Sequence, residues 1–265
     1  MSYEIKADLH THTIFSGHGY STVEENIREA ARMKLEAIAI TDHLGGCFID
    51  LDPLDTDFVV KKLGHFINTK ALPKEWCGVK LLSGVEIDIT DEKGNLYGHN
   101  IEIKNNQYHT LDKMILSKCD IVIASIHRTP GSWSEDKLQN TKMYCKALEN
   151  PDVLIIGHPG RAGISFELDT VLRTAKELGK MIEINEHSYD SANEVHEVCR
   201  KIAIRCAELG VNITVGSDAH CSYYVGKFPR ALSMLKDINF PCELIANTDF
   251  QRLNNVIQNS HFKII

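Results

Sequence analysis

The amino-acid sequence predicts an α/β fold, a barrel of parallel strands in the TIM style that is one β/α unit short of eight. Strand patterns and amphipathic helical patterns alternate along the 265 residues, as they do in chains built from parallel βα units. Six of the seven predicted strands also end at a side chain that can bind a transition metal. The active site of such a barrel lies at the carboxyl ends of its strands, so this second observation agrees with the first.

The strands are predicted from short apolar runs, many of them β-branched. They fall at residues 5–7, 37–41, 79–85, 121–126, 153–157, 181–185 and 211–216. Ser21 and Glu24 have the spacing of a capping box for a first helix. Apolar stripes predict further helices over about 58–67, 135–148, 168–178 and 195–209, and the last two end at Gly179 and Gly210.

One segment departs from the βα alternation. Between Ile87 and Ile103 the hydrophobic period shortens to two around Asp91 and Gly94, which predicts an inserted hairpin. The strand ends that carry histidines extend from His10 to His220. A domain boundary between them would divide the predicted site, so we expect a single domain over residues 1–265.

Composition limits the class of partner and the compartment. The formal net charge of −7, without a Lys/Arg cluster, argues against a nucleic-acid partner. Eight cysteines without a Cys-x-x-Cys pair indicate free thiols in a reducing compartment. The chain shows neither the apolar core of a signal peptide nor an apolar run of about 18 residues that could cross a bilayer. We therefore expect a cytoplasmic protein without a membrane partner, whose oligomeric state the sequence does not indicate.

The clearest functional signal is a set of potential metal ligands at one structural level. A lone His-x-His is equally consistent with one buried and one surface histidine, but here seven imidazoles and two carboxylates recur at or beside strand ends. These nine candidates are His10, His12, His18, His43, Glu86, His127, His158, Asp218 and His220. Nine ligands with one bridging carboxylate suit two or three ions, and the imidazoles favour Zn, Mn, Fe or Co over Mg or Ca.

Clustered divalent ions predict hydrolysis of phosphate esters. They lower the pKa of a bound water to make hydroxide, neutralise phosphate oxygens and stabilise the departing alkoxide. We therefore expect a phosphatase that acts on a small phosphorylated metabolite by attack of metal-bound hydroxide on phosphorus.

The motifs around these ligands resemble those of the PHP (polymerase and histidinol phosphatase) superfamily. Seven occur in order between residue 5 and about residue 230, and they are Asp8-Leu-His-x-His, Ser16-Gly-His, Ile40-Thr-Asp-His, Gly84-Val-Glu, Ile126-His, Gly157-His-Pro-Gly and Gly216-Ser-Asp-x-His. The chain is most similar to the YcdX-type stand-alone phosphatases. That resemblance implies a distorted (β/α)7 barrel and a trinuclear centre, with zinc as the preferred ion and manganese or iron as alternatives.

Carried over position by position, the resemblance implies how three ions share the ligands. One ion would bind His10, His12, Glu86 and Asp218, and a second would bind His18, His43 and His220. The third would bind His127 and His158, with Glu86 as a bridge. Glu86 and Asp218 are therefore expected to be essential to catalysis.

Other polar residues near the strand ends are candidates for substrate contacts. Arg161 and Arg128 are expected to bind the phosphate through bidentate hydrogen bonds, Arg161 also contributing to catalysis. Asn185 and His187 follow the sixth predicted strand and are expected to contact the substrate, with His187 a candidate proton donor.

Two carboxylates lie next to ligands. Asp8 and Asp42 are candidates to orient imidazoles through their second ring nitrogen, with a capping or turn role as the alternative.

Rival functions stay open at this point. They are histidinol-phosphate phosphatase, a 3′–5′ exonuclease or phosphodiesterase, and a non-catalytic domain that keeps metals for regulation.

Overall fold

Parallel strands form the centre of the protein in the computed structural model, which describes residues 3–46, 61–103, 107–127, 133–260 and 262. Along the main path of the sheet, neighbouring strands are β1 (Ala7–Asp8), β2 (Ala37–Ile40), β5 (Val79–Asp88), β6 (Ile121–Ser125), β7 (Ile155–Ile156), β8 (Met181–Asn185) and β9 (Ile213–Gly216). These are the seven predicted strands, and all six pairings between them are parallel. Two short strands, β3 (His43–Leu44) and β4 (Glu75–Trp76), also pair with β5.

The sheet curves until its outer strands, β1 and β9, lie close together. The buried Asn247 amide joins them, because its Nδ2 donates to the Ala7 and Val215 carbonyls at 2.7 and 2.8 Å. Its Oδ1 accepts from the Val215 amide, and Thr11 and Ala219 form an isolated parallel bridge further along. The segment around Asn247 thus occupies the seam that an eighth strand fills in a complete barrel, which confirms the TIM-like fold with seven strands.

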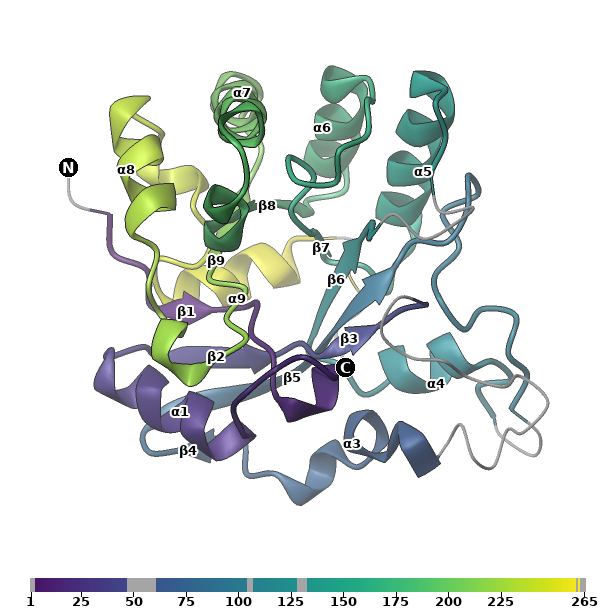
Figure 1. Ribbon diagram of the computed structural model, residues 1–265, viewed down its shortest axis with the longest axis vertical. Coiled ribbons are helices and arrows are strands. Elements are labelled where there is room, and N and C mark those ends of the chain that lie inside the picture. The colour runs from purple at the N-terminus through teal and green to yellow at the C-terminus, as the bar shows by residue number, and fades with distance from the viewer. Residues whose placement is uncertain (1–2, 47–60, 104–106, 128–132, 261, 263–265) are drawn as a thin grey trace.

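Helices cover the outside of this sheet (Figure 1). They are α1 (Val23–Arg32), α3 (Gly64–Ile67), α4 (Leu111–Leu116), α5 (Lys137–Glu149), α6 (Leu168–Glu177), α7 (Asn193–Leu209), α8 (Pro229–Asp237) and α9 (Phe250–Gln258). Short 3-10 turns are η1 (Ile14–Ser16), η2 (Thr69–Ala71), η3 (Glu186–Asp190), η4 (Ser222–Tyr224) and η5 (Cys242–Leu244). Every residue of β6 and β8 is buried, as expected for strands covered on both faces. No helix in the described ranges is long and apolar enough to span a membrane.

The start of α1 differs from the prediction by one residue. Thr22, not Ser21, is the N-cap, and Glu25 completes the capping box with it. The reason is that the Ser21 hydroxyl accepts from the Ser222 amide at 2.7 Å, so it serves a contact between distant segments. Local spacing could not distinguish the two caps because both have an acid three positions later.

Other predicted elements hold with shifted limits. The helices at 135–148, 168–178 and 195–209 are confirmed as α5, α6 and α7, and Gly179 and Gly210 have φ of +67° and +69°. Helix α3 covers the end of the segment predicted at 58–67, whose first residues lie outside the described ranges. The hairpin is reduced to an isolated bridge, Ile89 to Leu96, because β5 continues to Asp88 and pairs with β6.

Candidate metal centre

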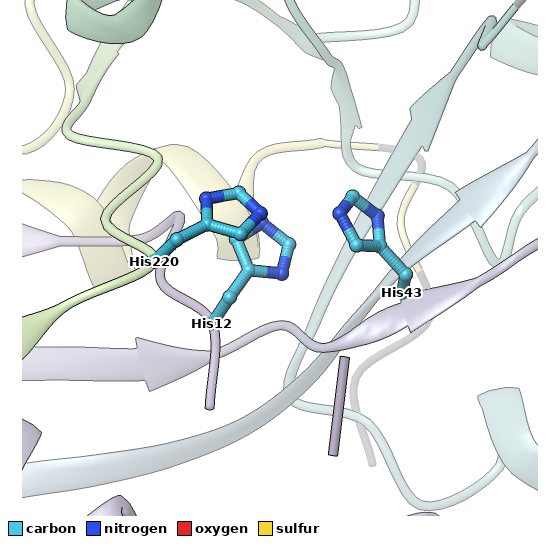
Figure 2. A group of neighbouring side chains, drawn as sticks. All are labelled: His12, His43 and His220. Carbon is cyan, nitrogen blue, oxygen red and sulfur yellow. The ribbon is translucent and has the colours of Figure 1, made fainter. Parts of the chain in front are cut away.

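The carboxyl ends of the strands bring the predicted ligands together. Four groups of three have ligand atoms within 4.8 Å of one another, and they are His10/His12/Asp218, His10/Glu86/His158, His43/Glu86/His127 and His12/His43/His220. Figure 2 shows the last group, in which three imidazoles from separate segments point into one space. Glu86 lies within β5 directly opposite His43 of β3, so the strand register itself creates that contact.

One set of four side chains has the spacing of a tetrahedral site. His10 Nε2 lies 3.2 Å from Glu86 Oε2 and 3.6 Å from Asp218 Oδ1, and His12 Nε2 lies 3.5 and 3.1 Å from the same two oxygens. Two ligands bound tetrahedrally to zinc at about 2.0–2.1 Å are about 3.3 Å apart. Four of the six edges of such a tetrahedron are therefore present.

The hydrogen-bonding state of these atoms also fits a metal. Among the described residues, His10 Nε2, His12 Nε2, Glu86 Oε2 and His220 Nε2 are buried without a hydrogen-bond partner. A buried polar atom without a partner costs roughly 1–3 kcal/mol. Four such atoms facing one another indicate that a cation completes their bonding, so the residues fit the ions that the sequence predicts.

His18 stands at the edge of the cluster. Its ring lies 4.3 Å from the ring of His220 and 5.0 Å from that of His43, measured between centroids. Its Nδ1 donates to the Ser16 carbonyl at 3.1 Å, as the Nδ1 of His220 donates to the Asp218 carbonyl at 2.9 Å. In a neutral imidazole held in this way, Nε2 keeps the lone pair that a metal requires.

Glu183 was not predicted from the sequence, although this acid interrupts an otherwise apolar strand. His10 Nδ1 donates to Glu183 Oε1 at 2.7 Å, and Oε2 accepts from the backbone amide of His158 at 2.9 Å. The carboxylate is 1% exposed, so a single buried acid orients two neighbouring ligands.

Asp88 was missed in the same way. His127 Nδ1 donates to Asp88 Oδ1 at 2.6 Å. Asp88 lies two residues after Glu86 on β5, and side chains two apart on a strand share a face. This periodicity was the signal that could have found it.

The two flanking carboxylates divide between the two roles considered for them. Asp8 accepts from the backbone amides of Ser217 and Gly226, and burial raises its pKa to about 6, so it holds a loop and not an imidazole. Asp42 orients His12 indirectly. Its Oδ1 accepts from the Ser16 hydroxyl, and the Ser16 Oγ lies 3.0 Å from His12 Nδ1.

The carboxylates of the cluster are held in their charged form. Burial alone would raise the pKa of Glu86, but His10 and His127 lower it well below its usual value. Burial would likewise raise the pKa of Asp218, and His10 and Arg161 lower it well below its usual value. Both groups are therefore anionic at neutral pH.

Several of the imidazoles are held neutral, as metal ligands must be. Burial and the neighbouring His43 lower the pKa of His12 well below its usual value, and burial lowers that of His220 to about 4. His10 is the opposite case, because Glu183 and Glu86 outweigh the effect of burial and raise its pKa.

Strained backbone marks two of the predicted ligands. His158 and Asp218 have φ of +28° and +56°, in the left-handed region that residues other than glycine seldom adopt. The Asp218 amide donates to the His10 carbonyl at 2.8 Å, and the His158 amide donates to Glu183. Hydrogen bonds from within the site thus hold both conformations, as is common where function requires an unfavourable geometry.

The candidate substrate residues lie in three different situations. Arg161 Nη2 donates to Asp218 Oδ2 at 2.6 Å and lines a cavity of about 360 Å³ with His18, His127 and His187. His187 is half exposed, and its Nδ1 lies 3.2 Å from Asp190. Arg128 lies outside the described residues.

Asn185 is 1% exposed, and its amide donates to Glu183 and Asp218 at 3.2 Å each. Its Oδ1 accepts from the Ser188 amide. Direct contact with substrate is therefore not supported for Asn185, because both ends of its amide are already used beneath the site.

The fold and the site together define a class of protein, an α/β barrel with a cluster of metal-binding side chains at its strand ends. The family model described as the PHP domain matches residues 8–204, and the chain belongs to this family. It is 40% identical over 265 residues to a probable phosphatase of Caldanaerobacter subterraneus subsp. tengcongensis, covering 100% of this chain and 95% of that one. A probable phosphatase of Thermoanaerobacter pseudethanolicus is 41% identical over 97% of this chain and 96% of its own length.

Solved structures support the fold. The histidinol phosphate phosphatase of Lactococcus lactis subsp. lactis Il1403, complexed with zinc, L-histidinol and phosphate, is 19% identical with a TM-score of 0.52. The match covers 89% of this chain and 94% of that one. A putative histidinol phosphatase from Listeria monocytogenes gives 16% identity and a TM-score of 0.50, over 84% and 98% of the two chains. At these identities the likeness concerns the barrel.

Proposed function

We propose that this protein is a metal-dependent phosphatase that hydrolyses a small phosphorylated metabolite at a centre of three divalent ions. The observation that carries the proposal is the set of four near-tetrahedral edges joining His10, His12, Glu86 and Asp218. Family membership supports it, since relatives of nearly the same length are named probable phosphatases.

The proposed ligand sets follow the resemblance. The first ion has His10, His12, Glu86 and Asp218, the second has His18, His43 and His220, and the third has His127 and His158 with Glu86 as a bridge. The ring contacts of His18 with His43 and His220 support the second set. The two oxygens of Glu86 support the bridge, since Oε1 lies 2.7 Å from His158 Nε2 and Oε2 lies 3.2 Å from His10 Nε2. Zinc is the preferred ion and manganese or iron the alternatives.

When bound, the ions would activate water and neutralise phosphate charge. The remaining work falls to the protein. Arg161, oriented by Asp218, would bind phosphate oxygens with its other guanidinium N–H groups, and Arg128 is proposed to assist it. His187, oriented by Asp190 at the edge of the cavity, would contact the substrate near the leaving oxygen.

Two further points belong to the proposal. We place the protein in the cytoplasm, because the seven cysteines that the structure describes are free thiols, which suits a reducing compartment. We treat residues 1–265 as one domain, because the segments that follow both outer strands, β1 and β9, contribute side chains to one cluster.

The test is hydrolysis of p-nitrophenyl phosphate by the chelator-treated protein after addition of Zn, Mn or Fe. We expect activity only with added ion, and loss of both bound metal and activity in Glu86→Gln. The matched control is His109→Asn, since His109 is exposed and Asn tolerates its left-handed φ of +63°. Glu86→Gln with normal metal content and normal turnover would refute the mechanism.

Parallel assays separate the rival activities. Preference for bis(p-nitrophenyl) phosphate would indicate a phosphodiesterase, and selective turnover of histidinol phosphate would name that substrate. Stoichiometric metal with no turnover of any ester would favour the regulatory domain.

A further inference from the structure

A second cavity adjoins the metal cavity. It has a volume of about 510 Å³, within the range of small-molecule sites. The two cavities share four lining residues, which are His187, Asp190, Asp218 and His220. A phosphate held at the metal cluster would therefore have this second space beside it for the organic part of an ester.

Tyrosines form much of the wall of this cavity. Tyr20, Tyr223 and Tyr224 are 83%, 64% and 58% exposed. Nine large hydrophobic side chains are exposed in the described part of the chain, and these three line a single cavity. Aromatic rings gathered around a hollow beside a reactive site indicate a surface that a ligand covers.

The tyrosine wall is attached to the metal cluster. The Tyr20 amide donates to the His220 carbonyl at 2.7 Å, and the Ser222 amide donates to the Ser21 hydroxyl at 2.7 Å. The Lys227 ammonium lies 3.3 Å from the centroid of the Tyr223 ring, which fixes that ring. The two loops that carry the rings are thus held to each other and to a proposed ligand before substrate arrives.

The charged side chains that line this cavity already have partners. Asp218 is bonded to Arg161 and the Lys227 ammonium lies 3.9 Å from Glu29, while Glu186, Asp190 and Arg230 are paired with one another. Glu186 accepts from the Arg230 side chain at 2.8 Å and from the Ala231 amide at 2.8 Å, at the start of α8. Arg230 also donates to Asp190 at 2.6 Å. A charged substrate group would have to break these pairs, whereas an uncharged ring would not.

We propose that the alcohol part of the substrate carries an uncharged planar aromatic ring, which stacks against Tyr20 and Tyr224 while the phosphate lies at the metal cluster. This inference rests on the proposed phosphatase function and adds a substrate class to it. Stacking between aromatic rings contributes beyond buried area, so the ring itself distinguishes this substrate from an aliphatic ester of the same size.

The test uses two esters that differ only in aromaticity, benzyl phosphate and cyclohexylmethyl phosphate. Both have primary alkoxide leaving groups; because benzyl alcohol is the stronger acid of the two alcohols, the ratio of the native protein is also compared with that of hydrolysis by free hydroxide, which contains the leaving-group difference alone. For the zinc-loaded protein we expect kcat/KM for the benzyl ester to be about 3- to 10-fold higher, the range that aromatic pairing supports. Tyr224→Leu and Tyr20→Leu should each reduce the ratio toward one, whereas Tyr224→Phe, which keeps the ring, should retain it.

Calorimetry with benzylphosphonate and cyclohexylmethylphosphonate provides a reading that does not depend on turnover. Hydrolysis of both esters with a ratio near one, or a ratio that the leucine variants leave unchanged, would overturn the inference and leave the phosphatase function standing. Hydrolysis of neither ester would count against the function, and the phosphonates then decide the inference. Tighter binding of the aromatic phosphonate that the leucine variants abolish supports it, and equal or absent binding overturns it.

Discussion

At the scale of single residues, the proposed metal ligands depend on side chains behind them. His10 is held by Glu183, His127 by Asp88, and His12 through Ser16 by Asp42. Each hydrogen bond fixes which ring nitrogen faces the cluster, so the supporting residue sets both the direction and the protonation of the ligand.

Glu183→Gln should therefore weaken metal binding without removing a ligand. Glu183 accepts from His10 Nδ1 through one oxygen and from the His158 and Asn185 amides through the other. The substitution replaces one of these oxygens by an amide N–H, so either His10 or His158 loses its acceptor. We expect affinity for the ion at His10 to fall about 10- to 100-fold, as is common for such supporting residues. Competition with a chromogenic chelator measures it, and Glu177→Gln on the surface of α6 is the control. Equal affinities in the two variants would show that Glu183 has no such role.

Arg161→Ala should affect substrate binding more than metal content. The guanidinium is bonded to Asp218 yet lines the cavity, so its loss leaves the imidazole ligands in place. We expect kcat/KM to fall by roughly 30-fold or more, equivalent to about 2 kcal/mol for a charge-assisted hydrogen bond. Arg161→Lys should recover only part of this loss, because an ammonium cannot bind Asp218 and phosphate as a planar fork does. Arg173→Ala on α6 is the control, and an unchanged kcat/KM in Arg161→Ala would contradict the assignment.

At the scale of elements, the short strands beneath the site leave little space for an added side-chain atom. Strands β8 and β9 are parallel neighbours, and Gly216 at the end of β9 pairs with Asn185 of β8. A Cβ at Gly216 would lie 2.2 Å from Glu183 Oε1 and 3.0 Å from His10 Cβ. A glycine is therefore required here for close approach and not for its backbone conformation.

Gly216→Ala should disturb stability and metal binding together. The added methyl must displace the carboxylate that orients His10, and overpacking of this kind costs about 1–3 kcal/mol. Urea denaturation of the metal-free protein gives the stability, and metal analysis gives the occupancy. Gly64→Ala, where a Cβ would meet no atom within 4 Å, is the matched control. Similar unfolding free energies and metal occupancies in the two variants would mean that β9 can move to make room for the methyl group without a cost in stability.

At the scale of the whole molecule, a buried lysine lies away from the candidate metal cluster. Lys180 is 1% exposed, and its ammonium donates to the Asn150 carbonyl at 2.5 Å. Burial lowers the pKa of Lys180 to about 8, although Asp152 acts in the opposite direction. Between pH 8 and 10.5 the unfolded chain binds more protons than the folded chain, so the free energy of unfolding rises with pH across this interval.

Lys180→Met should remove that rise. At neutral pH both states of the native protein carry the charged lysine, and the cost of burying it is fully present. We expect the gain in unfolding free energy between pH 7.5 and 10 to be smaller by about 1–3 kcal/mol in the variant than in the native protein. Denaturant titrations at several pH values measure it, with Lys236→Met on the exposed face of α8 as control. Parallel curves for native protein and Lys180→Met would disprove the assignment.

The sequence predicts the strands and the set of ligands for a common physical reason. Strands covered on both faces are continuous apolar runs, so a histidine at the end of such a run stands out. Glu183 and Asp88 lie within strands, where the local pattern marks the position of each acid but does not show which histidine its carboxylate contacts. Which potential metal ligands form a group also depends on which strand ends lie side by side in the sheet. His158 shares a group with His10, and His127 shares one with His43, through pairings that involve β5 and residues far apart in sequence.

The seam at Asn247 has a consequence for how the protein is made. This amide joins Ala7, 240 residues earlier, to Val215, and the Ser217 hydroxyl bonds to the carbonyl of His10 across 207 residues. A ribosome adding about 5–20 residues per second completes His10 and His12 roughly 10–40 s before Asp218 exists. The first histidines of the nascent chain are therefore made long before the Asp218 carboxylate, and the proposed set of ions cannot be bound in full until most of the chain has been translated.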